Sequence, residues 1–279
     1  MRIFLNPQEI QKFIKKIKQQ NKSIGFVPTM GALHQGHISL IRRARKENDI
    51  VVVSIFVNPT QFGPKEDFSK YPRPVKKDIN VCKNEGVDLV FAPEPSEMYP
   101  ENYLTYITVE KLSDIMCGKF RPGHFRGVAT IVAKLFNIVQ PDRAYFGLKD
   151  FQQSVIVRKM VTDLNFPVKI ITCPIVREKD GLALSSRNVY LSYEERKKAV
   201  SLSRSLQTAK NLIKYKHVKS AEKIISGMRK IILPRVDKID YIDIRDAETL
   251  EELKYIKKKV VIAVAVSVGK TRLIDNITV

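Results

Sequence analysis

The pattern of apolar and polar residues changes its period several times along the first 57 residues. The first apolar positions recur at i, i+3, i+4 and i+7, which predicts a helix with one apolar face, and the Asn-Pro-Gln-Glu segment at 6–9 is typical of a helix N-terminus. These apolar positions are Ile10, Phe13, Ile14 and Ile17. A short apolar strand at 23–27, a loop, a helical stretch that ends at residue 47 and a β-branched run at 50–57 follow. Strand, helix and strand in this order predict a βαβ unit and a parallel sheet.

The same alternation continues to residue 173. Helices are predicted at 75–85, 128–139 and 150–164, and strands at 87–91, 143–146 and 168–173. Strands that alternate with helices indicate an α/β fold with a doubly wound parallel sheet, here over residues 1–175. Ligands of such sheets bind beyond the carboxyl ends of the strands, at the switch in strand order.

Residues 176–279 follow a different pattern. A glycine-containing turn is followed by helical stretches at 193–216 and 219–232 and by strands at 241–244, 260–266 and 272–274. Because these elements do not alternate regularly, they predict a smaller C-terminal α+β domain.

The net charge of +20 raises the question of nucleic-acid binding, since a basic surface attracts a phosphate backbone. The charge is spread evenly, because residues 1–175 hold 26 Lys/Arg against 16 Asp/Glu and residues 176–279 hold 23 against 13, so that each part carries +10. An RNA-binding module is expected to cluster its charge and to offer aromatic stacking platforms, and Trp is absent. We therefore expect a lysine-rich surface that attracts small anions, and no nucleic-acid partner.

The cysteines and the apolar runs indicate a cytoplasmic protein without a membrane partner. Cys82, Cys117 and Cys173 are odd in number and widely spaced, which suggests neither a disulfide framework nor a zinc site. The first ten residues lack a secretory apolar core, and the longest aliphatic run, 260–266, is too short to cross a bilayer.

The most specific local pattern is Thr-Met-Gly-Ala-Leu-His-Gln-Gly-His at 29–37, between the first strand of the βαβ unit and its helix. His34 and His37 are three residues apart at a helix start, so both imidazoles can face the same way, while Gly31 and Gly36 let the backbone approach a ligand. Free N–H groups and the helix dipole favour phosphate at this position. Histidine N–H donors there can stabilise charge on an α-phosphate during nucleotidyl transfer.

Three other interpretations of this loop compete. A metal site needs further ligands, and no nearby Cys, His or carboxylate has a suitable spacing, so no metal ligands are assigned. Buried core histidines fit poorly with two histidines in a glycine-rich loop. A dinucleotide-binding turn requires Gly-x-Gly-x-x-Gly, which is absent here.

Two more segments place polar side chains where a strand ends. Asn-Pro-Thr-Gln at 58–61 can orient a polar substrate, although Asn-Pro is also an ordinary strand terminator. In Phe-Gly-Leu-Lys-Asp-Phe-Gln-Gln at 146–153, Lys149 can meet a phosphate, and Gln153 lies one turn into the following helix, where it can face the same crevice.

A fourth segment, Asp-Gly-Leu-Ala-Leu-Ser-Ser-Arg-Asn at 180–188, joins the two predicted domains. Its hydroxyls and guanidinium suit an anionic cluster of oxygens, and a polar turn with an N-capping serine explains the segment equally well. By contrast, Gly-Lys-Thr at 269–271 lacks the earlier glycine and the following helix of a phosphate-binding P-loop, so a hairpin turn is predicted there.

Seven blocks of the sequence, in order, are similar to those of the pantoate-beta-alanine ligase family, whose superfamily of nucleotidyltransferases carries a His-x-Gly-His signature. They are PTMGALHQGH at 28–37, SIFVNPTQF at 54–62, YPRP at 71–74, RPGHFRGV at 121–128, FGLKDFQQ at 146–153, DGLALSSRN at 180–188 and RLIDN at 272–276. The resemblance implies a ligase that uses ATP and Mg²⁺. Pantoate and ATP give pantoyl adenylate and pyrophosphate, and beta-alanine then attacks the adenylate to give pantothenate and AMP.

The resemblance also implies roles for individual residues. Catalysis would fall to His37, His34, Lys149 and Arg187, with His37 as the usual proton donor of the family, although it can act by hydrogen bonding alone. Pantoate would be held by Gln61 and Gln153, and beta-alanine would lie near Gln61. The ATP site would comprise Met30, Gly31, Ala32, Leu33, His34, Gln35, Gly36, His37, Gly147, Leu148, Lys149, Asp150, Val176, Leu184, Ser185, Ser186 and Arg187.

At the level of the fold, the resemblance implies a Rossmann-like domain at 1–175, a C-terminal lid domain at 176–279 and a homodimer. A lid suits this chemistry because an acyl adenylate must be shielded from water. Leu148 departs from the family, which usually has an acidic residue before the Lys-Asp pair. The nearest rival function is that of another His-x-Gly-His nucleotidyltransferase, and the pair of glutamines, which suits a hydroxy acid, argues against it.

Overall fold

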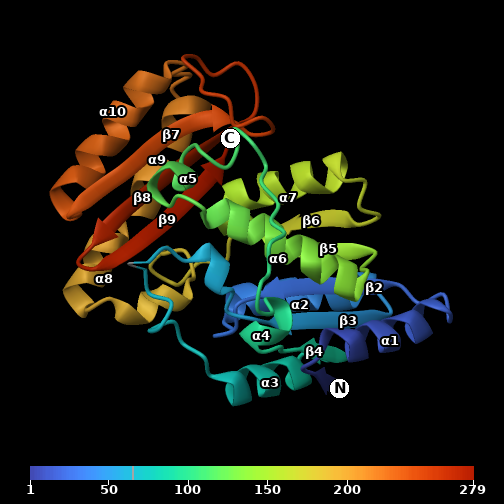
Figure 1. Cartoon of the computed structure of the whole chain (residues 1–279). Helices are drawn as coiled ribbons and strands as arrows, with labels where there is room; N and C mark the ends of the chain where they lie inside the picture. The colour runs from blue at the N-terminus through green and yellow to red at the C-terminus, as the bar shows by residue number, and fades with distance from the viewer. Residues whose placement is uncertain (65) are drawn as a thin grey trace. The chain divides into compact units, whose positions relative to one another are not determined.

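The computed structural model describes residues 1–64 and 66–279, which fold into two units (Figure 1). The larger unit comprises Met1–Leu148 and Ile156–Pro174. The smaller unit comprises Lys149–Val155 and Ile175–Val279.

The larger unit is built on a six-stranded sheet in which every pair of neighbouring strands is parallel. In spatial order the strands are β1 (Arg2–Phe4), β4 (Leu89–Phe91), β3 (Ile50–Ile55), β2 (Ile24–Thr29), β5 (Arg143–Gly147) and β6 (Lys169–Cys173). The order reverses at β2, which pairs with β3 on one side and β5 on the other. The carboxyl ends of β2 and β5 therefore border the switch point where such sheets bind ligands.

Helices cover both faces of this sheet, which confirms the predicted doubly wound fold. They are α1 (Pro7–Lys18), α2 (Gln35–Glu47), α3 (Val75–Asn84) and α6 (His124–Val139). Val27 of β2 belongs to the same buried cluster as Ile41 of α2. The neighbouring side chain, Phe26, points to the opposite face and meets Phe136 of α6 edge-on, with ring centroids 6.5 Å apart. Helix α1 packs against α6.

Further helices and 3₁₀ turns lie between residues 59 and 163. They are α4 (Pro95–Met98), α5 (Cys117–Phe120), α7 (Phe151–Asp163) and the 3₁₀ turns η1 (Pro59–Gln61) and η2 (Leu148–Asp150). The predicted N-cap of α1 is confirmed, because the Asn6 side chain accepts hydrogen bonds from the N–H groups of Gln8 and Glu9. Strand β1 was not predicted, since its three residues are exposed or half-buried and show no apolar alternation.

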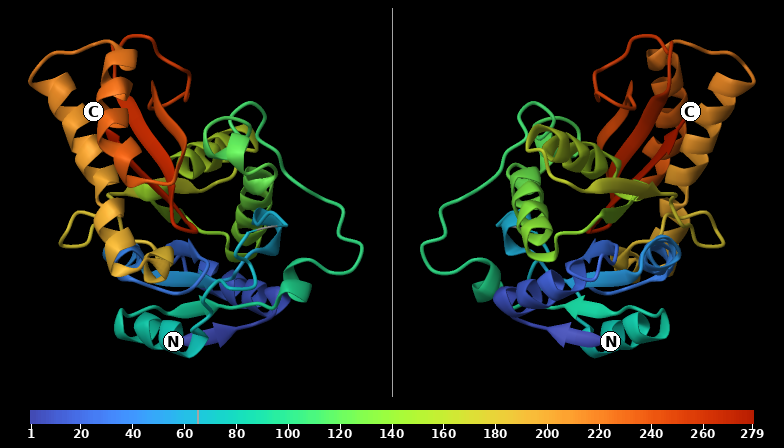
Figure 2. Two further views of the ribbon diagram at one scale, coloured as in Figure 1. Left: turned by 90° about the vertical axis from the view of Figure 1, so that its left-hand side faces the viewer. Right: turned by 90° about the vertical axis from the view of Figure 1, so that its right-hand side faces the viewer.

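The smaller unit packs two helices on one face of a three-stranded antiparallel sheet (Figure 2). Its elements are η3 (Ser186–Tyr190), α8 (Tyr193–Ala199), α9 (Ser201–Lys214), α10 (Ala221–Ile232), η4 (Leu233–Arg235), β7 (Lys238–Asp246), β8 (Val260–Val268) and β9 (Thr271–Thr278). Strand β8 lies between the other two and is almost wholly buried, while α9 and α10 carry the side chains that cover it. The predicted α+β character is confirmed.

Two helix predictions needed correction. The predicted helix 193–216 is divided into α8 and α9 at Val200, and the bend lets Ala199 and Leu202 enter one core. Helix α6 begins at residue 124, not 128, because Gly123 takes a left-handed conformation (φ +79°) and starts the helix before its apolar run. The predicted hairpin turn is confirmed, since Val268 pairs with Thr271 around Gly269 (φ +56°).

The three cysteines lie in the buried part of the larger unit. Cys82, Cys117 and Cys173 are buried, and burial, with a smaller contribution from Asp78, raises the pKa of the Cys82 thiol to about 12. Such a thiol is protonated at neutral pH and a poor nucleophile.

Among residues 1–64 and 66–279, no helix combines the length and the apolar character needed to cross a membrane.

Two glycines inside helices allow a matched test of this packing. A Cβ on Gly127 of α6 would lie 2.3 Å from the carbonyl oxygen of Thr60, whereas one on Gly227 of α10 would lie 3.5 Å from Leu212 Cδ1. We expect Gly127→Ala to lower the free energy of unfolding by about 1–3 kcal/mol or more through overpacking. We expect Gly227→Ala to raise it by about 0.5–1 kcal/mol, because alanine favours helix. Denaturant unfolding of both variants checks this, and equal stabilities would contradict the close contact of α6 with η1.

Candidate active site

The loop after β2 takes a left-handed course at two successive residues. Gly31 has φ +77° and Ala32 has φ +49°. The Thr29 hydroxyl holds the loop to the sheet, since it donates to the Ser54 carbonyl at 2.7 Å and accepts from the Gly31 N–H at 3.1 Å. The chain thereby turns sharply from the end of β2 into α2.

Asp78 of α3 anchors the next part of this loop, and sequence reasoning missed it. Its side chain is 1% exposed, and its two oxygens accept the N–H groups of Ala32 and Leu33, each at 2.8 Å. Burial raises the pKa of Asp78, and the two N–H donors and Lys77 oppose that rise. Asp78 follows Leu33 by 45 residues, so no local spacing marks the contact.

The two histidines of the loop lie side by side at the N-terminus of α2. Their ring centroids are 4.1 Å apart, and His34 is the N-cap residue. A Cβ on Gly36 would lie 2.8 Å from His34 Cε1, so the absence of a side chain there makes room for the imidazole. The structure thus brings the rings of His34 and His37 together, while their common orientation toward a ligand stays a prediction.

Hydrogen bonds assign the tautomer of both rings. Nδ1 of His34 accepts the Gly36 N–H at 3.1 Å, and Nδ1 of His37 accepts the His34 N–H at 3.3 Å. A neutral imidazole carries one proton, so acceptance at Nδ1 places that proton on Nε2. Each ring therefore has an Nε2–H donor.

The backbone donors of the loop are largely engaged within the protein. The N–H groups of Gly31, Ala32, Leu33, His34 and Gly36 donate to Thr29, Asp78 and the two imidazoles. The sequence interpretation relied on free N–H groups at the helix start as phosphate ligands. Of these five residues only Gly36 belongs to the first turn of α2, so the expected phosphate contacts of the helix start stay a prediction.

Gln61 follows β3 in η1 and contacts the His-x-Gly-His loop. Its Nε2 donates to Met30 Sδ at 2.9 Å, and its Oε1 accepts from Asn58 Nδ2 at 3.1 Å. Asn58 is 1% exposed and is itself fixed by the Gly127 carbonyl and the Tyr99 hydroxyl. The structure thus brings together Met30 and Gln61, two predicted ligand residues, and gives Asn58 the role of orienting the Gln61 amide.

The Arg-Pro-Gly-His segment at 121–124 supports the backbone of Gln61. His124 Nδ1 lies 2.8 Å from the Gln61 carbonyl oxygen, which only accepts, so Nδ1 carries the proton and Nε2 accepts from Arg121 Nη1 at 3.2 Å. Arg121 also donates to the Gln61 carbonyl at 3.2 Å and makes two bonds to Glu66. Burial raises the pKa of Glu66, but the guanidinium of Arg121, with smaller contributions from the Gly63 backbone and His124, leaves that pKa lowered.

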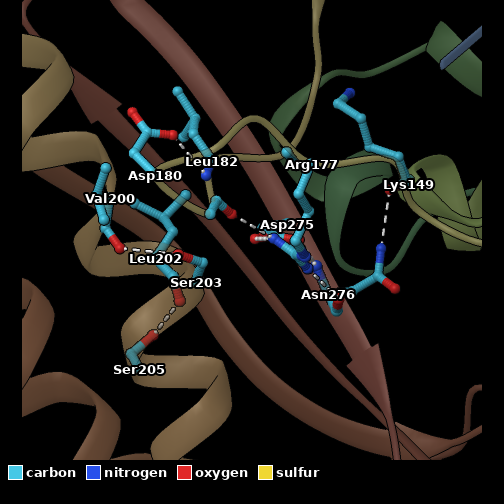
Figure 3. Close-up of polar contacts among 12 residues, drawn as sticks. Lys149, Arg177, Asp180, Leu182, Val200, Leu202, Ser203, Ser205, Asp275 and Asn276 are labelled. Atoms are coloured by element: carbon cyan, nitrogen blue, oxygen red, sulfur yellow. Dashed lines mark hydrogen bonds and ion pairs between the residues drawn. The ribbon is translucent and has the colours of Figure 1, made fainter. Parts of the chain in front are cut away.

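In the smaller unit, residues of β9 anchor the segment that contains Lys149 (Figure 3). The Asn276 side chain donates to the Lys149 carbonyl at 2.9 Å, and Lys149 Nζ lies 3.8 Å from Asp150 Oδ1. The neighbouring Asp275 is 2% exposed and receives two hydrogen bonds from Arg177, at 2.7 and 2.9 Å. The Arg-Leu-Ile-Asp-Asn block at 272–276 therefore anchors two segments with predicted ligand residues, one that contains Lys149 and one that contains Arg177.

The serine-rich segment at 180–188 forms a capped turn. The Leu184 N–H donates to the Val176 carbonyl at 3.0 Å, which joins two of the predicted ATP-binding residues. The Ser185 side chain accepts the Arg187 N–H at 3.3 Å and caps η3. The structural role predicted as the alternative for Ser185 is therefore confirmed, while its role toward ATP stays a prediction.

Comparisons with known proteins match this chain over nearly its whole length. The family model described as pantoate-beta-alanine ligase matches residues 2–278. A pantothenate synthetase from Thermotoga petrophila is 57% identical over 99% of both chains. A pantothenate synthetase structure from Thermus thermophilus superposes with a TM-score of 0.94 at 46% identity over 99% of both chains. A Francisella tularensis pantoate-beta-alanine ligase, complexed with beta-gamma ATP and beta-alanine, gives 0.82 at 36% identity over 99% of this chain and 97% of that one.

The hydrogen-bond network predicts opposite tautomers within one molecule. We expect the neutral rings of His34 and His37 to carry the proton on Nε2 and His124 to carry it on Nδ1. Long-range ¹H–¹⁵N correlation spectra of the ring nitrogens measure this, and the chain has only four histidines to assign. An Nδ1–H signal from His34 or His37 would contradict the arrangement at the start of α2.

Proposed function

The chain belongs to the pantoate-beta-alanine ligase family and joins pantoate to beta-alanine at the expense of ATP, and we propose here how its residues perform that reaction. The pantoate carboxylate attacks the α-phosphorus of ATP, and the bond to pyrophosphate breaks. The beta-alanine amine then attacks the acyl carbon, and AMP leaves. Neither step requires a covalent bond to the enzyme.

The paired imidazoles carry the proposal for the first step. Both rings accept a backbone N–H at Nδ1, so each has a donor at Nε2. The rings lie 4.1 Å apart at a helix N-terminus, where the dipole favours anions. We assign His34 and His37 to the phosphates, where two preorganised donors stabilise the charge that develops as pyrophosphate leaves. Hydrogen bonding suffices for this role, and proton donation by His37 is not required.

We also propose that Mg²⁺ binds together with ATP. Within the part of the chain that the structure describes, no three His, Cys, Asp or Glu side chains are grouped as metal ligands. Mg²⁺ is commonly bound by one or two carboxylates together with substrate phosphates, so such a cluster is not needed. We propose that the metal enters with the nucleotide and neutralises its phosphates.

Pantoate recognition is assigned to the two glutamines. Asn58 donates to Oε1 of Gln61 and one Nε2–H of Gln61 is directed to Met30 Sδ, so we assign the second Nε2–H as the donor for a carboxylate or hydroxyl oxygen. Gln61 also serves beta-alanine in this proposal, and Gln153 supplies a second amide. Support comes from the family match and from the burial of Gln61, which is 8% exposed.

The remaining ATP contacts are proposed by similarity to the family. They are assigned to Met30–His37, Gly147–Asp150, Val176 and Leu184–Arg187, with Lys149 and Arg187 at the phosphates. Leu148 is compatible with this if its position contributes backbone contacts only. We further propose domains at 1–175 and 176–279, the second acting as a lid, a homodimer, a cytoplasmic location and no nucleic-acid partner.

The histidine assignment predicts a loss of chemistry without a loss of fold. We expect His34→Ala and His37→Ala each to slow adenylate formation by about a hundredfold, the usual cost of removing a transition-state donor. Pantoate-dependent pyrophosphate release from MgATP measures it, with circular dichroism to verify folding. His217→Asn, at an exposed position just after the turn 215–216, is the control and should keep the wild-type rate. Near-normal turnover of both alanine variants would refute the assignment.

The glutamine assignment predicts which substrates each variant uses less well. Gln153→Ala should raise the KM for pantoate by about tenfold, the equivalent of one lost hydrogen bond to a charged group, and leave the KM for ATP unchanged. Gln61→Ala should weaken the use of both pantoate and beta-alanine. Steady-state kinetics with each substrate varied in turn decides this. A change confined to ATP would reassign Gln153 to the nucleotide.

A further inference from the structure

We propose that Asp78 is a positioning residue for adenylate formation, whose carboxylate holds the loop 30–34 in the shape that orients the Nε2–H groups of His34 and His37. The proposal rests on the function assigned above to the two histidines. Asp78 acts through the loop and is not itself a ligand of ATP.

The geometry of the carboxylate supports this role. Oδ2 accepts the Ala32 N–H and Oδ1 the Leu33 N–H, both at 2.8 Å, so each oxygen fixes one of two consecutive peptide groups. A Cβ on Gly31 would lie 3.0 Å from Oδ2, which shows how closely the loop is drawn onto the carboxylate. The peptide after Leu33 is that of His34, whose N–H donates to Nδ1 of His37. A shift at Leu33 is therefore transmitted to both rings.

The loop needs such a restraint because its conformation is unfavourable in isolation. Ala32 has φ +49°, in the left-handed region that residues with a Cβ adopt at an energetic cost. Hydrogen bonds from its N–H and from the following N–H offset that cost. Without them the loop is free to relax to an ordinary conformation, and the two imidazoles lose their common orientation.

Electrostatics separates this role from a purely structural one. Burial raises the pKa of Asp78, so the folded protein binds this proton more tightly than the unfolded chain, and ionisation of Asp78 costs stability as the pH rises. Asp246 provides the contrast. It is 2% exposed and accepts the N–H groups of Glu248 and Thr249, but although burial raises its pKa, Lys258 and these donors hold that pKa well below its ordinary value. Ionised Asp246 therefore stabilises the fold.

The test compares Asp78→Asn with the matched variant Asp246→Asn. An asparagine keeps the size of the side chain and one acceptor, and turns an NH₂ group toward a backbone N–H. We expect Asp78→Asn to lower kcat/KM for ATP, in pantoate-dependent pyrophosphate release, by about tenfold to a hundredfold, as for a misplaced catalytic group. Its Tm should fall less than that of Asp246→Asn. The Asp246→Asn variant should keep kcat/KM within about twofold of the wild type, because its loss is one of stability and not of loop geometry.

Two further readouts show whether Asp78 acts through the histidines. In the double variant Asp78→Asn/His37→Ala, the loss should hardly exceed that of His37→Ala alone, because residues that act as a unit are not additive. The ring ¹⁵N spectra of Asp78→Asn should lose the Nε2–H signature of His34 and His37, while the signature of His124 is retained. If Asp78→Asn does not fold, Gly31→Ala disturbs the same contact from the loop side and should give the same kinetic and spectroscopic changes.

Three results would overturn the proposal. The first is a wild-type kcat/KM in folded Asp78→Asn. The second is a double variant whose loss of kcat/KM equals the product of the losses in Asp78→Asn and His37→Ala. The third is an unchanged set of ring spectra for His34 and His37. Failure of the proposed function would give a different experimental result. In that case His37→Ala keeps the wild-type rate, whereas the spectra of Asp78→Asn still show whether the carboxylate orients the rings.

Discussion

The parallel pairing of β2 with β3 on one side and β5 on the other determines where the chemistry of the larger unit lies. In a parallel sheet the carboxyl ends of neighbouring strands meet at one edge, and at the point where the strand order reverses the following loops diverge to opposite faces. The His-x-Gly-His loop follows β2, Gln61 follows β3, and Gly147 ends β5. Three segments far apart in the sequence are thereby brought to one edge of the sheet.

Hydrogen bonding then fixes the orientation of the polar groups at this edge. Asp78 holds the backbone of the loop, the imidazole Nδ1 atoms hold the helix start, and Asn58 holds the Gln61 amide. Each of these contacts satisfies a polar group inside the protein and at the same time orients a donor on a neighbouring group. The donors so oriented are the Nε2–H of each imidazole and one Nε2–H of Gln61, which suit phosphate and carboxylate oxygens.

Much of this was accessible from the sequence, because it depends on local patterns. The capping of α1 by Asn6, the alternation of strands and helices and the turn at Gly269 are each encoded within a few residues. The contact of Asp78 with the loop is different, since it spans 45 residues and depends on how α3 packs. The support of Gln61 by the segment around Arg121 is likewise long-range. Pattern reasoning identified the candidate ligand residues and missed the residues that hold them in place.

We propose that pantoyl adenylate forms reversibly before beta-alanine reacts. The most direct test is the exchange of labelled pyrophosphate into ATP, measured with the purified enzyme and Mg²⁺, with and without each substrate. We predict exchange that requires pantoate and proceeds without beta-alanine. Exchange that begins only when beta-alanine is added, or formation of ADP and phosphate in place of AMP and pyrophosphate, would contradict the account.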